Sequence, residues 1–343
     1  RGLFFNKPVR DAEIRVYASL LLLSPAQQAR LRELHVEYLH ECRLQGKEIV
    51  DRIMVESRRW AATASTPGPD LHATITAHFD AHRDLFALQR RLFENMLSRF
   101  APSLTVEQRG RLELCRAHRN VYRNSGHGLY WSPALHFDLA RQLQRFADQY
   151  RLDERALLYA ARAPLASWLH AVGPLHARYL ERYQSEEAYL HLAGSMAQIE
   201  GLPDQEKLLR WGRTRADLGR RLNEQAVVAI EAVASSLARD FGEAFRDFAL
   251  LQLYPTIWRD DYPIDDLARS AIPCFPEDVS GEMIRDVRRT DRGLRRRLML
   301  AMDEVREKYT TYRSGFNQPS QLMDRPDFRI FRELDRQRAD AVL

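Results

Sequence analysis

Two histidines one helical turn apart have the spacing that most directly suggests chemistry. His78 and His82 form an HxxxH pair, and side chains four positions apart project from the same face of a helix. Two imidazoles so placed are a partial ligand set for a transition metal. If the chain folds back about residue 66 or 67, Asp51 comes opposite this turn, with Glu48 nearby, and offers an oxygen ligand. The alternative is that both histidines are structural residues beside an apolar stripe.

Six arginines near the end of the chain follow helical steps on one face. They are Arg285, Arg288, Arg289, Arg292, Arg295 and Arg296. This stripe fits an acidic protein partner or an anionic lipid surface, and its alternative is an ordinary solvated helix face. Nucleic acid is not expected as a partner, because no aromatic residues for base stacking alternate with the arginines.

Aromatic residues gather in a Gly- and Asn-rich break at residues 122–133. Tyr130 and Trp131 either hold two halves of the chain together or form an exposed contact surface, since aromatic residues are enriched at interfaces. Among the three cysteines no zinc-binding spacing occurs. Cys42 and Cys115 lie on apolar stripes, so they are either small buried side chains or a disulfide pair in an oxidising compartment.

The sequence offers no constellation for catalysis. It contains no GxSxG, HExxH, Walker A or GxGxxG motif, and no spacing singles out a nucleophile with its base. We therefore expect a protein that is not an enzyme and has no cofactor, apart from a divalent transition metal at the histidine pair.

Composition indicates a globular chain that does not cross a membrane. The 343 residues are 45% hydrophobic and 29% charged, with a net charge of +5. No run of 18 apolar residues occurs, so no membrane-spanning segment is expected. The chain begins at Arg1 without an initiating methionine, which suggests that a signal peptide, an anchor or a tag preceded it.

The elements that would position these residues are long amphipathic helices. Ser24 and Pro25 have the chemistry of a helix start, and apolar residues then recur every three or four positions to Trp60. A Pro- and Gly-rich turn leads to a second such stripe at residues 71–100, which predicts an antiparallel hairpin. Thr105 and Gln108 predict a capping box that opens the next helix, which runs to about Asn120.

The second half repeats this pattern on a larger scale. We expect a helix from about residue 133 to 150, and another from Asp153 that is kinked at Pro164 and broken at Gly173 and Pro174. A further helix then reaches residue 199, and one of about fifty residues follows Asp204. The fold class is thus all-α, with long antiparallel hairpins in two halves. The predicted domains are residues 1–121 and 134–343, the second containing a Pro- and Asp-rich connector at 254–280.

Two helix starts resemble a known family motif. Leu23-Ser24-Pro25-Ala26-Gln27 and Leu104-Thr105-Val106-Glu107-Gln108 resemble the LTxxQ motif of the periplasmic helical-hairpin family that includes Spy and CpxP. The second copy has all three fixed residues, and the first has Ser in place of Thr. The similarity covers about residues 12–120. It implies an envelope location, a non-enzymatic helical fold, and binding of proteins or, as in the metal-sensing relatives CnrX and ZraP, of metals through His and carboxylate groups.

These observations lead to one main functional hypothesis and two alternatives. The main hypothesis is a non-catalytic periplasmic or other envelope protein that binds other proteins as an accessory subunit or adaptor of a larger assembly. Such an assembly could hold it at the membrane through a partner or through a removed N-terminal segment. The first alternative is a Spy- or CpxP-like chaperone. The second is a metal-sensing or metal-binding protein built on His78 and His82.

Overall fold

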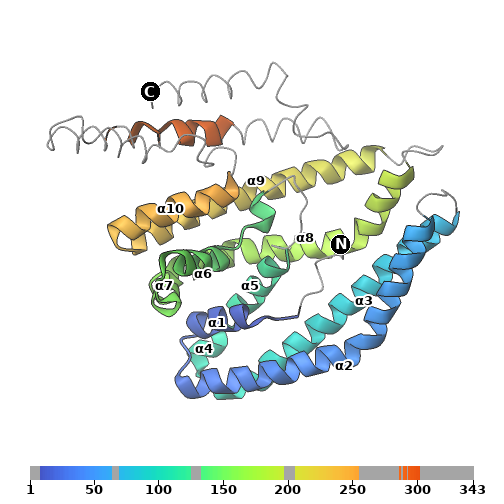
Figure 1. Ribbon diagram of the computed structural model, residues 1–343, viewed down its shortest axis with the longest axis horizontal. Helices are drawn as coiled ribbons and strands as arrows, with labels where there is room; N and C mark the ends of the chain where they lie inside the picture. Colours follow the sequence, from blue (N-terminus) through green and yellow to red (C-terminus); the bar gives the residue numbers. More distant parts are fainter. Residues whose placement is uncertain are drawn as a thin grey trace. The chain divides into compact units, whose positions relative to one another are not determined.

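The part of the chain that the structure describes is helical apart from short turns and caps. The computed structural model describes residues 8–63, 69–124, 133–196, 205–254, 286, 289–291 and 293–301. Within these ranges no β-strand occurs, and the all-α prediction is confirmed (Figure 1). The chain forms two compact units, one of Arg1–Leu208 with Leu222–Arg246 and one of Leu209–Arg221 with Asp247–Leu343.

Ten α-helices and two short 3-10 helices are assigned over the described residues. The α-helices are α1 (Asp11–Leu20), α2 (Pro25–Thr63), α3 (Pro69–Phe100), α4 (Val106–Gly110), α5 (Leu112–Asn124), α6 (Leu139–Tyr150), α7 (Glu154–Ala160), α8 (Arg162–Met196), α9 (Gln205–Ser236) and α10 (Arg239–Leu253). The 3-10 helices are η1 (Ala101–Ser103) and η2 (Pro133–His136). None of the described helices has a stretch long and apolar enough to span a membrane.

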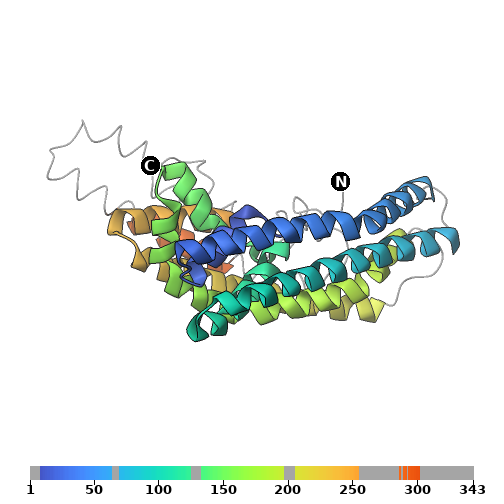
Figure 2. The same cartoon turned by 90° about the horizontal axis from the view of Figure 1, so that it is seen from below.

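Two long helices of the first unit, α2 and α3, lie side by side and run in opposite directions (Figures 1 and 2). Side-chain pairs cross between them, joining Arg99 to Glu37, Arg91 to Gln45 and Arg52 to Asp84. In each pair the midpoint between the two residue numbers is position 68, so the register between the two helices stays constant along their length. The predicted elements at 24–60 and 71–100 therefore exist and lie beside each other.

Apolar side chains on the facing stripes of α2 and α3 join α1 and α5 in one core. Leu31, Leu34 and Tyr38 of α2 are buried against residues of α3 such as Leu92 and Met96. This core extends from Val9 before α1 to Cys115 in α5. Toward the other end of the pair, Leu71, Ile75 and Phe79 form a separate small cluster with Trp60.

The prediction that Gly173 and Pro174 break a helix is wrong, because α8 continues through both residues. The Cβ atom of an alanine at position 173 would lie 2.6 Å from Cβ of Ala117 in α5. Gly173 therefore allows α8 to cross close to α5. The predicted kink at Pro164 is also replaced by a break at Ala161, which puts Pro164 in the first turn of α8, where its missing N–H is tolerated.

The single helix of about fifty residues after Asp204 is also a wrong prediction, because α9 ends at Ser236 and α10 begins at Arg239. At Gly242 an added Cβ would meet the carbonyl oxygen of Ala234 at 2.2 Å, so the chain turns tightly and only glycine fits there. The apolar stripe continues across the turn, which is why periodicity alone did not reveal the break.

Other predictions about the second half stay predictions. Residues 125–132 and most of the connector at 254–280 lie outside the described residues. The second antiparallel hairpin and the domain limits 1–121 and 134–343 are likewise not tested. Among the described residues, α8 packs mainly on α5 and α3 of the first unit.

Candidate functional site

Two glutamines join the predicted capping boxes at one end of the α2–α3 pair. The backbone N–H groups of Ser24 and Thr105 donate to Oε1 of Gln27 and Gln108 at 2.9 and 3.0 Å. In return, the backbone N–H groups of the two glutamines donate to the hydroxyl oxygens of Ser24 and Thr105. Nε2 of Gln27 also donates to Oε1 of Gln108 at 2.8 Å. The motif residues thus fasten two helix starts that lie 81 residues apart. We call these two side chains the glutamine pair.

The glutamine pair also holds the loops that precede the two helices. Nε2 of Gln27 donates to the carbonyl oxygen of Ser103 at 2.8 Å, and Nε2 of Gln108 donates to that of Leu22 at 3.1 Å. Leu22 has a φ of 53°, a left-handed conformation that is unfavourable for a residue with a Cβ atom. The hydrogen bond from Gln108 helps to hold this conformation, so the pair has a clear structural role.

The predicted metal ligands His78 and His82 lie together on α3, with ring centroids 4.6 Å apart. Nδ1 of His78 is 3.3 Å from Oγ of Ser57, and the ring of Trp60 is 5.1 Å from that of His78. Burial lowers the pKa of both imidazoles, and His78 lowers that of His82 further, to about 4. Both rings are therefore neutral at pH 7, the form that can bind a metal.

The third predicted ligand does not join the two histidines. Asp51 forms an ion pair of 2.7 Å with Lys47 on its own helix. The reason is the register, because a hairpin centred on position 68 places His78 beside Ser57 and moves Asp51 away from this turn. Over the described residues, no group of three His, Cys, Asp or Glu side chains is arranged to hold a metal ion. Metal binding at His78 and His82 stays a prediction.

The arginine stripe lies mostly outside the described residues. Of its six members the structure describes Arg289, Arg295 and Arg296, which belong to the second unit. Arg289 is exposed and pairs with Asp286 at 2.8 Å, whereas Arg295 is only 8% exposed and pairs with Asp291 at 2.6 Å. Arg295 therefore does not belong to an exposed binding face. Arg285, Arg288, Arg292, Tyr130 and Trp131 are not described, so their proposed contacts are not tested.

Sequence reasoning missed a set of buried polar side chains around α5. Nη1 of Arg119 donates to both carboxylate oxygens of Glu13 in α1, at 2.9 and 3.0 Å, and both side chains are buried. One turn later Arg123 is buried as well, with its guanidinium carbon 4.3 Å from the centroid of the Phe86 ring. The cysteines nearby, Cys42 and Cys115, are both free thiols. No motif marks these arginines, since their spacing is that of any solvated helix face.

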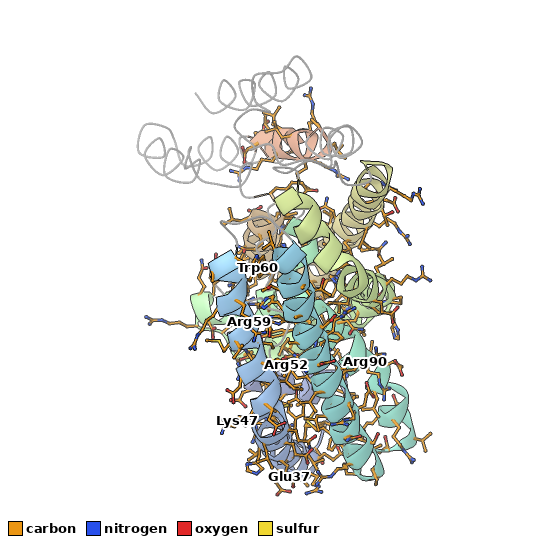
Figure 3. All side chains as sticks on the ribbon, turned by 90° about the vertical axis from the view of Figure 1, so that its right-hand side faces the viewer. Glu37, Lys47, Arg52, Arg59, Trp60 and Arg90 are labelled. Atoms are coloured by element: carbon orange, nitrogen blue, oxygen red, sulfur yellow. The ribbon has the colours of Figure 1, made fainter. Side chains whose placement is uncertain are left out.

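Sequence reasoning also missed an apolar surface on α2. On the side away from the core, five large apolar side chains are exposed, and we call them the outer face of α2. They are Val36, Leu44, Val50, Met54 and Val55. Charged side chains such as Lys47 and Arg59 also lie along α2 (Figure 3). A helical-wheel count of α2 would have shown these residues, because they fall between the core positions.

The comparisons with known proteins do not identify a relative. No family model, curated protein or solved structure matches the chain.

Proposed function

We propose that this protein binds other proteins through the outer face of α2, as a non-catalytic accessory subunit or adaptor of an envelope assembly. The observation that carries the proposal is the exposure of large apolar side chains along one face of a long helix. Leu44 is 70% exposed and Val36 is 66% exposed. Isolated exposed apolar residues are ordinary, but a row along one face is typical of an interaction surface.

The energetics of such a face favour binding. Full burial of one Val, Leu or Met side chain is worth about 1.5–3 kcal/mol, so a partner that covers Val36, Leu44 and Met54 would gain several kcal/mol. Arg43 and Lys47 lie among these residues and stay solvated when the helix is free. An apolar centre with charged residues at its border is the usual composition of a protein interface.

The glutamine pair supports the envelope part of the proposal. It gives Gln27 and Gln108, the residues that carry the LTxxQ resemblance, a shared structural role in joining two helix starts. That role fits a motif that occurs in two copies on either side of a helical hairpin. The family resemblance in turn supports an exported, protein-binding chain, and these remain parts of the proposal.

A Spy- or CpxP-like chaperone is the second candidate, and the same face favours it. A chaperone would use the outer face of α2 for transient contacts with unfolded chains, whereas a subunit would keep one partner in a fixed ratio. Val50, Met54 and Val55 are close to half exposed and alternate with charged residues, which also suits many weak contacts. The two candidates differ in stoichiometry and in client range.

The experiment that tests both candidates compares matched valines. Val36 is 66% exposed on α2, and Val228 is 63% exposed on α9. We expect Val36→Glu to reduce the amount of a fixed-ratio partner that co-purifies from native membranes by about tenfold or more, as the loss of a good apolar contact predicts, and Val228→Glu to have no effect. Quantitative mass spectrometry measures both. Suppression of the aggregation of unrelated unfolded proteins, lost in Val36→Glu only, would favour the chaperone. Equal behaviour of both variants and the wild type would contradict binding by this face.

A further inference from the structure

Arg123 is a buried cation that forms no ion pair with any acidic side chain of the described residues. The residue is 4% exposed, and its Nε and Nη2 atoms are shielded from solvent. Among the residues that the structure describes, neither atom has a hydrogen-bond partner. Burial and the neighbouring guanidinium of Arg119 lower the pKa of Arg123 to about 9, so the cation persists at pH 7.

The nearest carboxylate is already fully used. Glu13 accepts two hydrogen bonds from Arg119, one from the hydroxyl of Tyr17 at 3.3 Å and one from the backbone N–H of Arg10 at 3.0 Å. The other titratable groups that influence Arg123 are Tyr17 and Tyr38. Burial raises the pKa of both phenols, so they remain neutral. Among the residues that the structure describes, the charges of Glu13 and Arg119 cancel, which leaves the positive charge of Arg123.

The contact with Phe86 does not balance this charge. A cation–π contact contributes about 0.5–2 kcal/mol, whereas a buried and unpaired ion costs several kcal/mol even after the protein relaxes. The chain that directly follows α5 cannot supply the missing charge either, because residues 125–132 contain no Asp or Glu. The same is true of residues 1–7, which precede the described part of the N-terminus.

The two unsatisfied atoms define the kind of ligand that would fit. Nε and Nη2 lie on the same edge of a guanidinium, so their N–H bonds point in parallel and match the two oxygens of one planar anion. We propose that this edge of Arg123 binds a carboxylate, supplied by a small organic acid or by an acidic group of a partner. A carboxylate carries one charge and would neutralise the cluster, whereas a dianionic phosphate would leave a buried negative charge.

The surface next to Phe86 offers a direction of approach. Phe86 lines a surface depression of about 530 Å³ on α3. The depression is also lined by Arg83, Arg90 and Arg91 and by the carboxylates of Asp84 and Glu94, so cationic side chains exceed anionic ones by one along its wall. Phe86 is the residue that this depression shares with the contact to the Arg123 guanidinium.

The test is thermal unfolding of the full chain in sodium formate against sodium chloride at equal ionic strength, followed by circular dichroism. We expect a saturable rise in Tm of about 2–4 °C with formate, whereas sulfate should give only the non-saturating rise of a general salt effect, equal in the wild type and in the Arg123 variants. Arg123→Met removes the charge but keeps the volume, and we expect it to have a higher Tm than the wild type in chloride and no response to formate. Arg90→Met, an exposed arginine of the same depression, should respond as the wild type does. A second variant, Arg123→Gln, provides the same comparison if Arg123→Met folds poorly.

Two results would overturn the proposal. One is a formate response that is equal in the wild type and in both Arg123 variants, since that is a general salt effect. The other is the absence of any formate response in the wild type. Titration of ¹³C-formate, followed by its NMR line width, checks the same point without unfolding. Broadening in the wild type that persists in Arg123→Met would place the anion elsewhere. If acetylated acidic peptides bind more tightly than formate and compete with it, the carboxylate comes from a partner protein.

Discussion

Helices α5 and α2 distribute polar and apolar residues in opposite ways. In α5, a helix of 13 residues, His118, Arg119 and Arg123 are buried. In α2, a helix of 39 residues, Val36 and Leu44 are exposed on the side away from the core. Charges inside a protein must be paired, and apolar side chains outside it gain stability when they are covered. The comparison suggests that α5 helps to hold the first unit together, whereas α2 carries the face that we propose for binding.

The largest effect on stability is expected from the ion pair that α5 makes with α1. Glu13→Gln keeps the shape of the side chain but leaves the buried guanidinium of Arg119 without its counter-ion. We expect a loss of about 3–5 kcal/mol in the free energy of unfolding, measured with urea. The control is Asp51→Asn, which breaks the exposed pair with Lys47 and should lose less than about 1 kcal/mol. Similar losses in both variants would show that α5 does not depend on its buried charge.

A second effect concerns the acid sensitivity of the buried histidine on α8, the helix that packs against α5. Burial lowers the pKa of His176 to about 3, although the carboxylate of Asp138 acts in the opposite direction and His136 adds to the decrease. The histidine pKa of the unfolded chain is near 6.5, so between pH 6.5 and pH 3 this histidine is protonated in the unfolded chain and neutral in the folded chain. Stability from this group is present above pH 6.5 and falls as the pH decreases below it.

Because of His176, we expect the free energy of unfolding to fall by about 2–3 kcal/mol when the pH is lowered from 7 to 4.5. The variant His176→Gln cannot take up this proton, so its unfolding free energy should decrease less over the same range. Urea unfolding at both pH values measures the difference in slope, whatever the variant does to stability at pH 7. Equal slopes would mean that His176 is protonated in the folded protein.

The close approach of α8 to α5 predicts a third effect. Gly173→Ala places a Cβ atom 2.6 Å from that of Ala117, and one of the helices must shift. Overpacking of this kind lowers stability by about 1–3 kcal/mol. Gly110→Ala is the matched control, because an added Cβ at that position in α4 has no neighbour within 4 Å. It should be neutral or slightly stabilising, since alanine favours the helix.

The sequence predicts the elements of this molecule better than their contacts. The helices at 25–63 and 69–100, and the capping box at Thr105 and Gln108, follow from local periodicity and cap chemistry. The turn before α10 and the passage of α8 through Gly173 depend on tertiary contacts, which local patterns do not contain. The histidine site shows most clearly how far sequence patterns can predict contacts. The sequence suggests a hairpin centred on residue 66 or 67, and the observed centre at position 68 is enough to separate Asp51 from His78.

A smaller effect is expected at the glutamine pair. Gln27→Ala and Gln108→Ala each remove hydrogen bonds that are partly solvated, and each should lose about 0.5–1.5 kcal/mol. Because the two side chains bond to each other, the double variant should lose less than the two single losses combined. A double-mutant cycle in urea measures this coupling. Strict additivity would show that the two capping boxes act independently and that the pair does not fasten the helix starts.

The smallest effect on stability is expected on the outer face of α2. Val36→Glu changes a side chain that is mostly in solvent, so the free energy of unfolding of the isolated protein should change by less than about 0.5 kcal/mol. Leu34→Glu, two residues earlier and buried in the core, should prevent folding or lose several kcal/mol, because it buries an unpaired charge. If Val36→Glu is also strongly destabilising, this face is covered in the folded chain. It would then belong to the architecture of the protein, and the contrast between α2 and α5 would disappear.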